Sequence, residues 1–173
     1  MARSTAFEIL YREYYARVFG LCRRLLNSGE LAEDAAQEAF MRAYKAFGKY
    51  DPEQPFWQWI AAIANHHCID LIRRQSRADA LFGDEAGDVE QLSTEQPMML
   101  SELISAEEAG FLNDAIGRLP DRYRIPVVLA YFNQSSYDQI AEQLGISRNH
   151  VGVLLLRAKQ KLRADLDAGE EGR

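Results

Sequence analysis

The stretch SSYDQIAEQLGISRNHVGVLLLRAKQKL, residues 135–162, decides how this chain is interpreted. Apolar residues recur at helical spacing as far as Leu144, and Gly145 then interrupts the pattern. Ser147 suits the N-cap of a second helix, because its hydroxyl can accept a hydrogen bond from a free backbone N–H. Two helices joined by a turn of about three or four residues that contains glycine form a helix-turn-helix.

The second helix of this motif is predicted to run from about Arg148 to Leu162. Its buried face is expected to carry Val151, Leu155, Ala158 and Leu162. The first turn consists of Arg148, Asn149 and His150, in the position from which such helices contact base edges in a major groove. An ordinary helical hairpin is the simpler alternative, but the turn chemistry, the length and the polar first turn together favour DNA binding.

The net charge of −6 would ordinarily argue against a nucleic-acid partner, but the charge is unevenly distributed. Residues 1–77 carry a net charge of +2, residues 78–108 contain 9 acids and no base, and residues 109–173 carry +1. The low pI therefore belongs to the separating segment. With 47% apolar residues the chain can build packed cores. We predict an all-α fold of two small helical domains, residues 1–77 and 106–173, joined by a flexible acidic linker.

Several classes of protein and site are excluded. No window approaches about 18 apolar residues and no apolar run follows a basic N-terminus, so we expect no membrane insertion and a cytoplasmic location. Cys22 and Cys68 lie in apolar helical surroundings, which predicts free buried thiols. His66, His67 and Cys68 cannot converge on one metal ion, because consecutive helical residues point about 100° apart. No catalytic triad or phosphate-binding glycine loop is evident, so we expect neither an enzyme nor a cofactor.

Three helices are predicted in the first domain, over residues 4–26, 31–47 and 56–74. The third opens with the aromatic sequence FWQW and ends near Arg73 and Arg74. Aromatic and basic side chains together are typical of single-strand binding, since every base offers a face for stacking. A core role for the aromatic residues, and a helix-dipole role for the arginines, are the alternatives.

The second domain is predicted to begin near Ala106, and Pro120 and Asp121 open its next helix. A short helix over residues 98–104 is expected to lead into this domain. The polar tail after Leu166 is expected to fray.

With these motifs in order, the chain resembles the extracytoplasmic-function (ECF) sigma factors of the sigma-70 family. EDAAQEAFMRAY (residues 33–44) and FWQWIAAIANHHCIDLIRR (residues 56–74) are similar to region 2 of that family. LPDRYRIPVVLAYF (residues 119–132) and SYDQIAEQLGIS (residues 136–147) are similar to region 4. Four motifs in the right order across an acidic linker cover nearly the whole chain. The resemblance implies a bacterial alternative sigma factor that binds core RNA polymerase and directs promoter-specific transcription initiation.

Region 2, by this resemblance, docks on a coiled coil of core RNA polymerase and captures an extruded base of the single-stranded −10 element. The implied polymerase-binding residues are Asp34, Gln37, Glu38, Phe40 and Arg42. The implied −10 residues are Lys49, Tyr50, Asp51, Asn65, His66, Ile69 and Arg73. Because flipping a base costs a few kcal/mol, the pocket must return a comparable free energy.

Region 4, by the same resemblance, inserts the helix that starts at Arg148 into the major groove of the −35 element. The implied −35 residues are Arg122, Arg124, Ser147, Arg148, Asn149, His150, Val153 and Arg157. The acidic linker, residues 78–105, would lie in the nucleic-acid channel of the polymerase as a mimic of a strand.

The sequence departs from the family pattern at both DNA-reading helices. His66 stands where the family usually has Asn, and Gly152 and Leu154 stand where it often has Lys and Arg. Each missing phosphate contact should lower the salt slope by about one unit. The outward face of the recognition helix is expected to consist of Asn149, Val153, Leu156 and Gln160. Two interpretations of this apolar face compete: Val153 contacts thymine methyl groups, or the face docks on a regulatory protein.

Core RNA polymerase and promoter DNA are thus the implied partners, and an anti-sigma factor or another regulator is a further candidate. The main alternative is a stand-alone helix-turn-helix regulator that binds duplex DNA as a dimer without polymerase. It leaves the aromatic helix and the acidic linker unexplained. A second alternative is a sigma-like interaction protein whose DNA surfaces have decayed, as Gly152 and Leu154 suggest.

Overall fold

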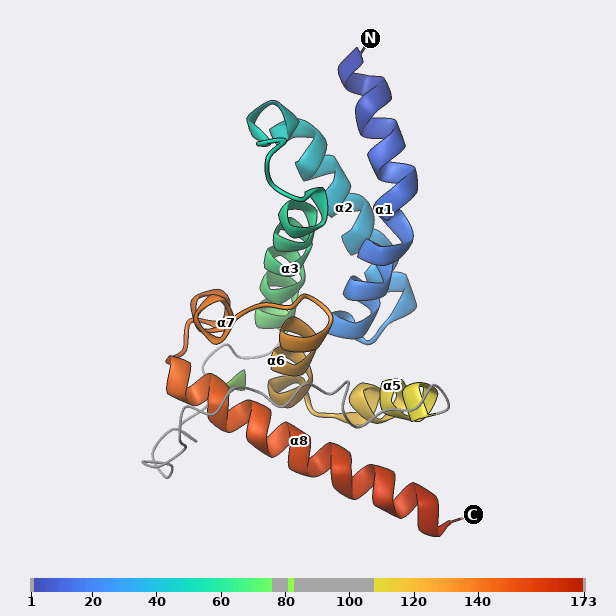
Figure 1. Ribbon diagram of the computed structural model, residues 1–173, viewed down its shortest axis with the longest axis vertical. Helices are drawn as coiled ribbons and strands as arrows, with labels where there is room; N and C mark the ends of the chain where they lie inside the picture. The colour runs from blue at the N-terminus through green and yellow to red at the C-terminus, as the bar shows by residue number, and fades with distance from the viewer. Residues whose placement is uncertain (1, 76–80, 83–107, 173) are drawn as a thin grey trace. The chain divides into compact units, whose positions relative to one another are not determined.

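The computed structural model describes residues 2–75, 81–82 and 108–172, and in these ranges it contains helices and no strand. The predicted all-α fold is confirmed (Figure 1). The chain divides into two compact units, Met1–Ser76 and Arg77–Arg173. Apart from residues 81–82, the predicted acidic linker and the predicted short helix over residues 98–104 lie outside the described residues. Within the described ranges, no helix combines the length and apolar character needed to cross a membrane.

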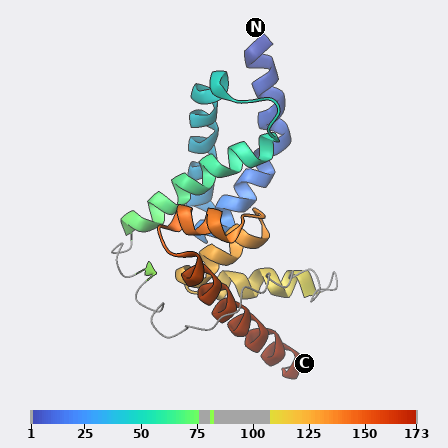
Figure 2. The ribbon, with the colours of Figure 1, turned by 60° about the vertical axis from the view of Figure 1, so that its left-hand side comes forward.

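The first unit is a bundle of three helices that all pack on one another. They are α1 (Ala2–Leu26), α2 (Gly29–Ala46) and α3 (Phe56–Gln75), and the short 3-10 helix η1 (Phe47–Lys49) follows α2 directly. Figures 1 and 2 show α1 and α2 side by side, with α3 returning along them. The loop after η1 therefore brings the chain back to start α3 beside the end of α2.

A tight turn joins α1 to α2. Asn27 has a φ of 53°, a left-handed conformation that Asn tolerates and that ends a helix. Ser28 is extended and its hydroxyl accepts a hydrogen bond of 3.4 Å from the backbone N–H of Leu31, so it caps α2. With this cap α2 starts at Gly29, two residues before the predicted start at residue 31.

Small residues let the helices of the first unit approach closely. The buried side of α2 consists mostly of alanine, at positions 32, 35, 36, 39 and 43. Larger buried side chains from α1 and α3, including Leu21, Leu25 and Ile60, fill the core. Cys22 and Cys68 are free and fully buried, as predicted. A hydrogen bond from one thiol to the other, together with burial, raises the pKa of Cys68.

The second unit consists of α5 (Glu108–Arg118), α6 (Asp121–Tyr131), α7 (Tyr137–Leu144) and α8 (Arg148–Glu171). The long helix α8 packs against each of the other three. α7 lies by the N-terminal end of α8, and α5 lies beside its later turns (Figures 1 and 2). α8 therefore serves as the spine of this unit.

The turn between α7 and α8 confirms the predicted helix-turn-helix. A reciprocal capping box between Ser136 and Gln139 starts α7. Gly145, with a φ of 66°, ends it in the left-handed conformation that glycine adopts most easily. The backbone N–H of Ile146 returns to the carbonyl of Ala141 at 3.1 Å, and the Ser147 hydroxyl accepts from the N–H of His150 at 3.1 Å to start α8.

The helix α8 extends much farther than expected. The predicted buried positions Val151, Leu155, Ala158 and Leu162 are buried. The helix does not fray after Leu166 but continues to Glu171, so that prediction is wrong. An exposed ion pair of 3.5 Å between Arg118 of α5 and Asp165 links α8 to α5 just before this tail begins.

Candidate protein and nucleic-acid interfaces

The outward face of α2 carries most of the predicted polymerase-binding residues. Asp34, Gln37 and Arg42 are exposed and Glu38 is partly exposed. Arg42 and Glu38, one turn apart, form an ion pair of 2.8 Å. The hydrogen bond from Arg42 lowers the pKa of the Glu38 carboxyl, which therefore stays ionised at neutral pH.

Phe40 lies on the side of the same helix that faces α1 and is only 3% exposed. Its ring packs edge-on against Tyr11 of α1, with 4.8 Å between ring centroids, and also lies near Tyr15 and Phe7. Direct contact between this side chain and a partner is therefore not available in this conformation. The structure corrects the expected placement, because the α1 aromatic residues bury Phe40 in the seam between the two helices.

Two large apolar residues on the outward face were missed from the sequence. Met41 is 56% exposed and Tyr44 is 48% exposed, and neither was among the predicted polymerase-binding residues. Met41 follows Gln37 by four residues, and Tyr44 follows it by seven, so all three share one side of the helix. The ring of Tyr44 also rests on Phe7 of α1, at 5.1 Å between centroids. The spacing of four and seven residues from Gln37 was the sequence signal that could have identified Met41 and Tyr44.

The predicted −10 loop is held by its own hydrogen bonds. The Tyr50 hydroxyl donates to the carbonyl of Gln54 at 2.5 Å, and a carboxylate oxygen of Asp51 accepts from the N–H of Glu53 at 3.0 Å. Lys49, at the end of η1, is exposed. These two hydrogen bonds link residues within the loop to one another.

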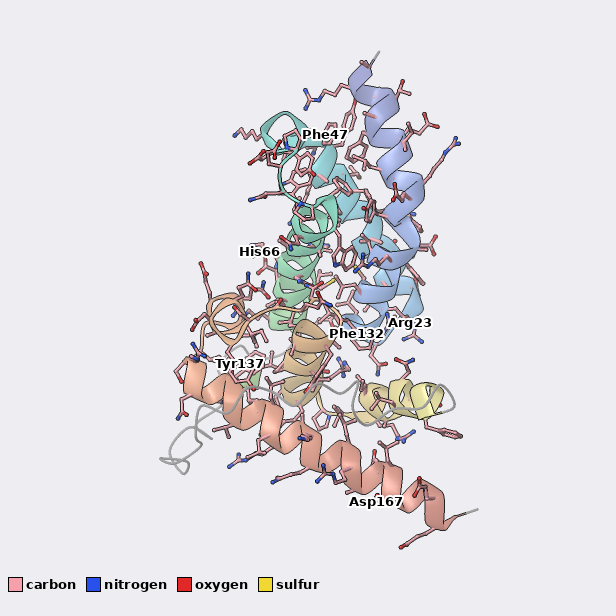
Figure 3. The ribbon with its side chains drawn as sticks, viewed as in Figure 1. Arg23, Phe47, His66, Phe132, Tyr137 and Asp167 are labelled. Atoms are coloured by element: carbon pink, nitrogen blue, oxygen red, sulfur yellow. The ribbon has the colours of Figure 1, made fainter. Side chains whose placement is uncertain are left out.

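An aromatic cluster supports this loop. The half-buried ring of Tyr50 lies 4.8 Å from Trp59 and 5.7 Å from Phe56, and stacks on Phe47 at 5.9 Å between centroids (Phe47 is labelled in Figure 3). Burial, and then the charge of Asp51, raises the pKa of Tyr50, so its hydroxyl stays protonated. The aromatic start of α3 therefore belongs largely to a packed cluster, in which Phe56 is buried and Phe47, Tyr50 and Trp59 are partly exposed.

The four residues of α3 predicted to contact the −10 element divide into two pairs. His66 is exposed, with its ring nitrogen 3.6 Å from Asp70, and Arg73 is partly exposed (His66 is labelled in Figure 3). Asn65 is 1% exposed and Ile69 is also buried. Of the predicted −10 contacts on α3, Asn65 and Ile69 therefore lack exposed side chains in this conformation, whereas His66 and Arg73 are accessible.

The buried Asn65 amide has no hydrogen-bond partner within the described part of the chain. Both its oxygen and its nitrogen lack a hydrogen bond there, although buried polar groups are normally satisfied. Its predicted contact with a base would require that this side chain become exposed.

The first turn of α8 is only partly open. Arg148 and Asn149 are exposed, but His150 is buried with its backbone N–H bonded to the Ser147 cap. Val153 is 1% exposed, so its expected place on the outward face is wrong. Leu156 and Gln160 are exposed as predicted, and Arg157 is partly exposed.

The predicted phosphate-binding arginines of α6 differ in their surroundings. Arg124 is buried, and its guanidinium donates to the Asp121 carboxylate at 2.6 Å and to the carbonyl of Leu119 at 3.2 Å. It is used to hold the start of α6, which corrects its expected exposure to DNA. Arg122 is partly exposed and lies 4.9 Å from the centre of the Tyr123 ring.

Comparison with known proteins identifies the family. Residues 10–78 match the family described as Sigma-70 region 2, and residues 112–162 match Sigma-70, region 4. The ECF RNA polymerase sigma factor SigW of Bacillus subtilis (strain 168) is 31% identical over 166 residues, which are 93% of this chain and 89% of SigW. The chain belongs to the ECF group of the sigma-70 family. It is an alternative sigma factor that directs RNA polymerase to promoters, and the stand-alone helix-turn-helix regulator is not favoured.

Other similarities extend over nearly the whole chain. The RNA polymerase sigma factor YlaC of B. subtilis is 27% identical over 172 residues, covering 99% of this chain and 98% of YlaC. The solved sigma factor RpoE, in complex with the anti-sigma factor NepR from Bartonella quintana, has a TM-score of 0.61 at 17% identity and covers 94% of this chain and 97% of its own. CnrH, in complex with the cytosolic domain of CnrY, has a TM-score of 0.56 at 24% identity. The match covers 95% of this chain and 90% of CnrH. These two structures support the fold of this sigma factor.

Proposed function

We propose a division of labour between the two units of this sigma factor. Residues 1–77 hold the chain on core RNA polymerase and on the melted −10 strand, residues 106–173 select the −35 duplex, and residues 78–105 connect them. The observation that carries this proposal is the outward face of α2, where exposed Met41 and Tyr44 are surrounded by charged and amide groups.

The α2 face has the anatomy of a protein interface. Specific interfaces combine an apolar centre with a polar rim, and methionine and tyrosine are enriched at their centres. Met41 and Tyr44 supply the centre, and Asp34, Gln37 and the Glu38–Arg42 pair supply the rim. Phe40 supports this face from beneath, as a packing residue.

The −10 surface combines the ordered loop with the accessible residues of α3. The half-exposed ring of Tyr50 offers a stacking surface next to exposed Lys49 and Asp51. His66 and Arg73 are open to a strand. The buried residues Asn65 and Ile69 contact DNA only if the side chains around them move when DNA binds.

The −35 surface is centred on the start of α8. Arg148 and Asn149 are exposed beside the Ser147 cap, where a recognition helix contacts bases. Arg157 and Arg122 are partly exposed and are proposed to contact phosphates. His150 and Val153 take part only if their side chains become exposed on the promoter.

The protein acts without catalysis of its own and in the cytoplasm, where its polymerase and promoters are found. An anti-sigma factor is a further proposed partner, supported by the solved complex of the sigma factor RpoE with the anti-sigma factor NepR.

The proposal is tested by transcription in vitro from a library of genomic fragments, with core RNA polymerase and with or without this protein. New start sites that depend on the protein, preceded by shared −35 and −10 sequences, are the expected result. Binding to duplex DNA without any new start site would instead support the stand-alone regulator.

A further inference from the structure

An ion pair joins the N-terminal turns of the two helices of the helix-turn-helix. A carboxylate oxygen of Asp138, the second residue of α7, lies 3.1 Å from Nη1 of Arg148, the first residue of α8. The guanidinium carbon of Arg148 lies 6.0 Å from the centre of the Tyr137 ring. Tyr137 is labelled in Figure 3, where α7 meets the start of α8.

Tyr137 also contacts the next turn of α8. A Cβ atom added at Gly152 would lie 3.8 Å from Cε2 of Tyr137, an ordinary van der Waals separation. The ring is half-buried, and its burial raises the pKa of the hydroxyl while the positive charge of Arg148 opposes that rise. The Tyr137 ring, Asp138 and Arg148 therefore form one local arrangement, which we call the α7–α8 clasp.

The clasp does little for folding. The Asp138 and Arg148 side chains are 73% and 62% exposed, and exposed ion pairs contribute little to stability because water screens them. What it does fix is the direction of a long side chain that would otherwise sample many rotamers. A pre-oriented side chain loses less entropy when it binds.

The guanidinium retains free donors while it is held in this way. Arginine has five N–H donors in a planar fork, and the bond to Asp138 uses Nη1. The remaining donors are available for a base edge. A bidentate pair of hydrogen bonds from arginine to guanine is the commonest specific contact in a major groove. The carboxylate, in contrast, repels the phosphate backbone of any sequence.

We propose that Asp138 is a positioning residue for −35 recognition, which directs Arg148 toward a base edge and away from phosphate. This inference rests on the proposed function, in which Arg148 reads the −35 element. It assigns a specificity role to a residue of α7 that itself needs no contact with a base. It also has an unusual signature, because Asp138 raises discrimination between sequences while it lowers affinity for all of them.

The test uses the full-length protein bound to core polymerase and a promoter fragment obtained from the transcription library. Affinity is measured for that fragment and for versions with each −35 base pair replaced in turn. Asp138→Asn keeps the shape and removes the charge. We expect the preference for the original −35 sequence to fall about two- to fivefold, the range that an exposed ion pair can supply, while affinity for unrelated DNA does not fall.

Glu142→Gln is the matched control, because it removes the same charge from the exposed face of α7 at its other end. It should leave the −35 preference unchanged. If Asp138→Asn raises affinity for every sequence equally and leaves the preference intact, Asp138 acts only by repulsion and the inference is overturned. The inference is also overturned if Asp138→Asn and Glu142→Gln change the −35 preference by the same amount.

Arg148→Ala separates this inference from the proposed function. In an Arg148→Ala background, Asp138→Asn should have no further effect on preference, because a positioning residue acts through the group that it positions. If Arg148→Ala alone relaxes the preference and Asp138→Asn does not, only the inference fails. If Arg148→Ala changes nothing while transcription still depends on the protein, the proposed role of Arg148 fails and the inference falls with it.

Discussion

The outward face of α2 and the start of α8 are both exposed helical surfaces, yet they are built for different partners. The α2 face presents Met41 and Tyr44 within a rim of charges and amides. The start of α8 presents a single exposed arginine, already paired with Asp138, while Gly152 adds no side chain there and Leu154 is buried. Under the proposed division of labour, this difference assigns affinity mainly to the α2 face and the choice of promoter mainly to the recognition helix.

The largest expected effect concerns the support of the α2 face. Phe40→Ala should lower the free energy of unfolding by about 3–5 kcal/mol, because it removes a buried ring that packs on Tyr11 and Phe7. Urea denaturation followed by circular dichroism measures this. Phe40→Leu should retain both the fold and polymerase binding. A stable Phe40→Ala protein that no longer binds polymerase would show that Phe40 is a contact residue, as the sequence had suggested.

The next effect tests the apolar centre of that face. Met41→Asp should weaken binding to core polymerase about 10- to 100-fold, since it places a charge where an interface excludes water. Fluorescence anisotropy of labelled protein titrated with core polymerase gives the affinity. Ile9→Asp, on an α1 residue that is equally exposed, is the control and should have little effect. Equal losses in both variants would remove the distinction between this face and the rest of the unit.

A smaller effect is expected from the scaffold of the recognition helix. Ser136→Ala removes the reciprocal capping box of α7 and should lower stability by about 1 kcal/mol. Thermal denaturation of the full chain measures the loss, and binding to core polymerase through α2 should be unchanged. A parallel loss of affinity for core polymerase would mean that the second unit also contributes to polymerase binding.

The smallest effect is expected from adding a basic side chain to the recognition helix α8. Gly152→Lys has room for its Cβ beside Tyr137 and replaces a poor helix former. The holoenzyme should bind promoter DNA more tightly, with a salt dependence steeper by about one unit. Gly169→Lys adds the same charge near the end of α8, where an added Cβ meets nothing within 4 Å, and should leave the slope unchanged. An unaltered slope for Gly152→Lys would show that this position does not face phosphate.

Local chemistry explains why much of the fold was predictable. The helix-turn-helix follows from Gly145, which ends one helix in a left-handed conformation, and from Ser147, which caps the next. Both signals act over a few residues and need no tertiary partner. The end of α8 was misjudged because a polar composition does not by itself end a helix, and α8 continues to Glu171.

The sites were less predictable, because exposure depends on what each helix packs against. Periodicity places Phe40 and Tyr44 one turn apart, but only the aromatic residues of α1 decide that Phe40 is buried and that Tyr44 remains half-exposed. The sequence predicted that Arg124 contacts phosphate, but in the structure its guanidinium donates hydrogen bonds to Asp121 and to the carbonyl of Leu119.

By itself, the sequence determined the helical class, the helix-turn-helix and the family, since these depend on spacing, caps and motif order along the chain. Only the tertiary structure decided which side chains are free to meet a partner. It buried Phe40 and Val153, exposed Met41, and joined Asp138 to Arg148. The physical reason is that burial and ion pairing are properties of neighbours in space, and residues far apart in sequence supply those neighbours.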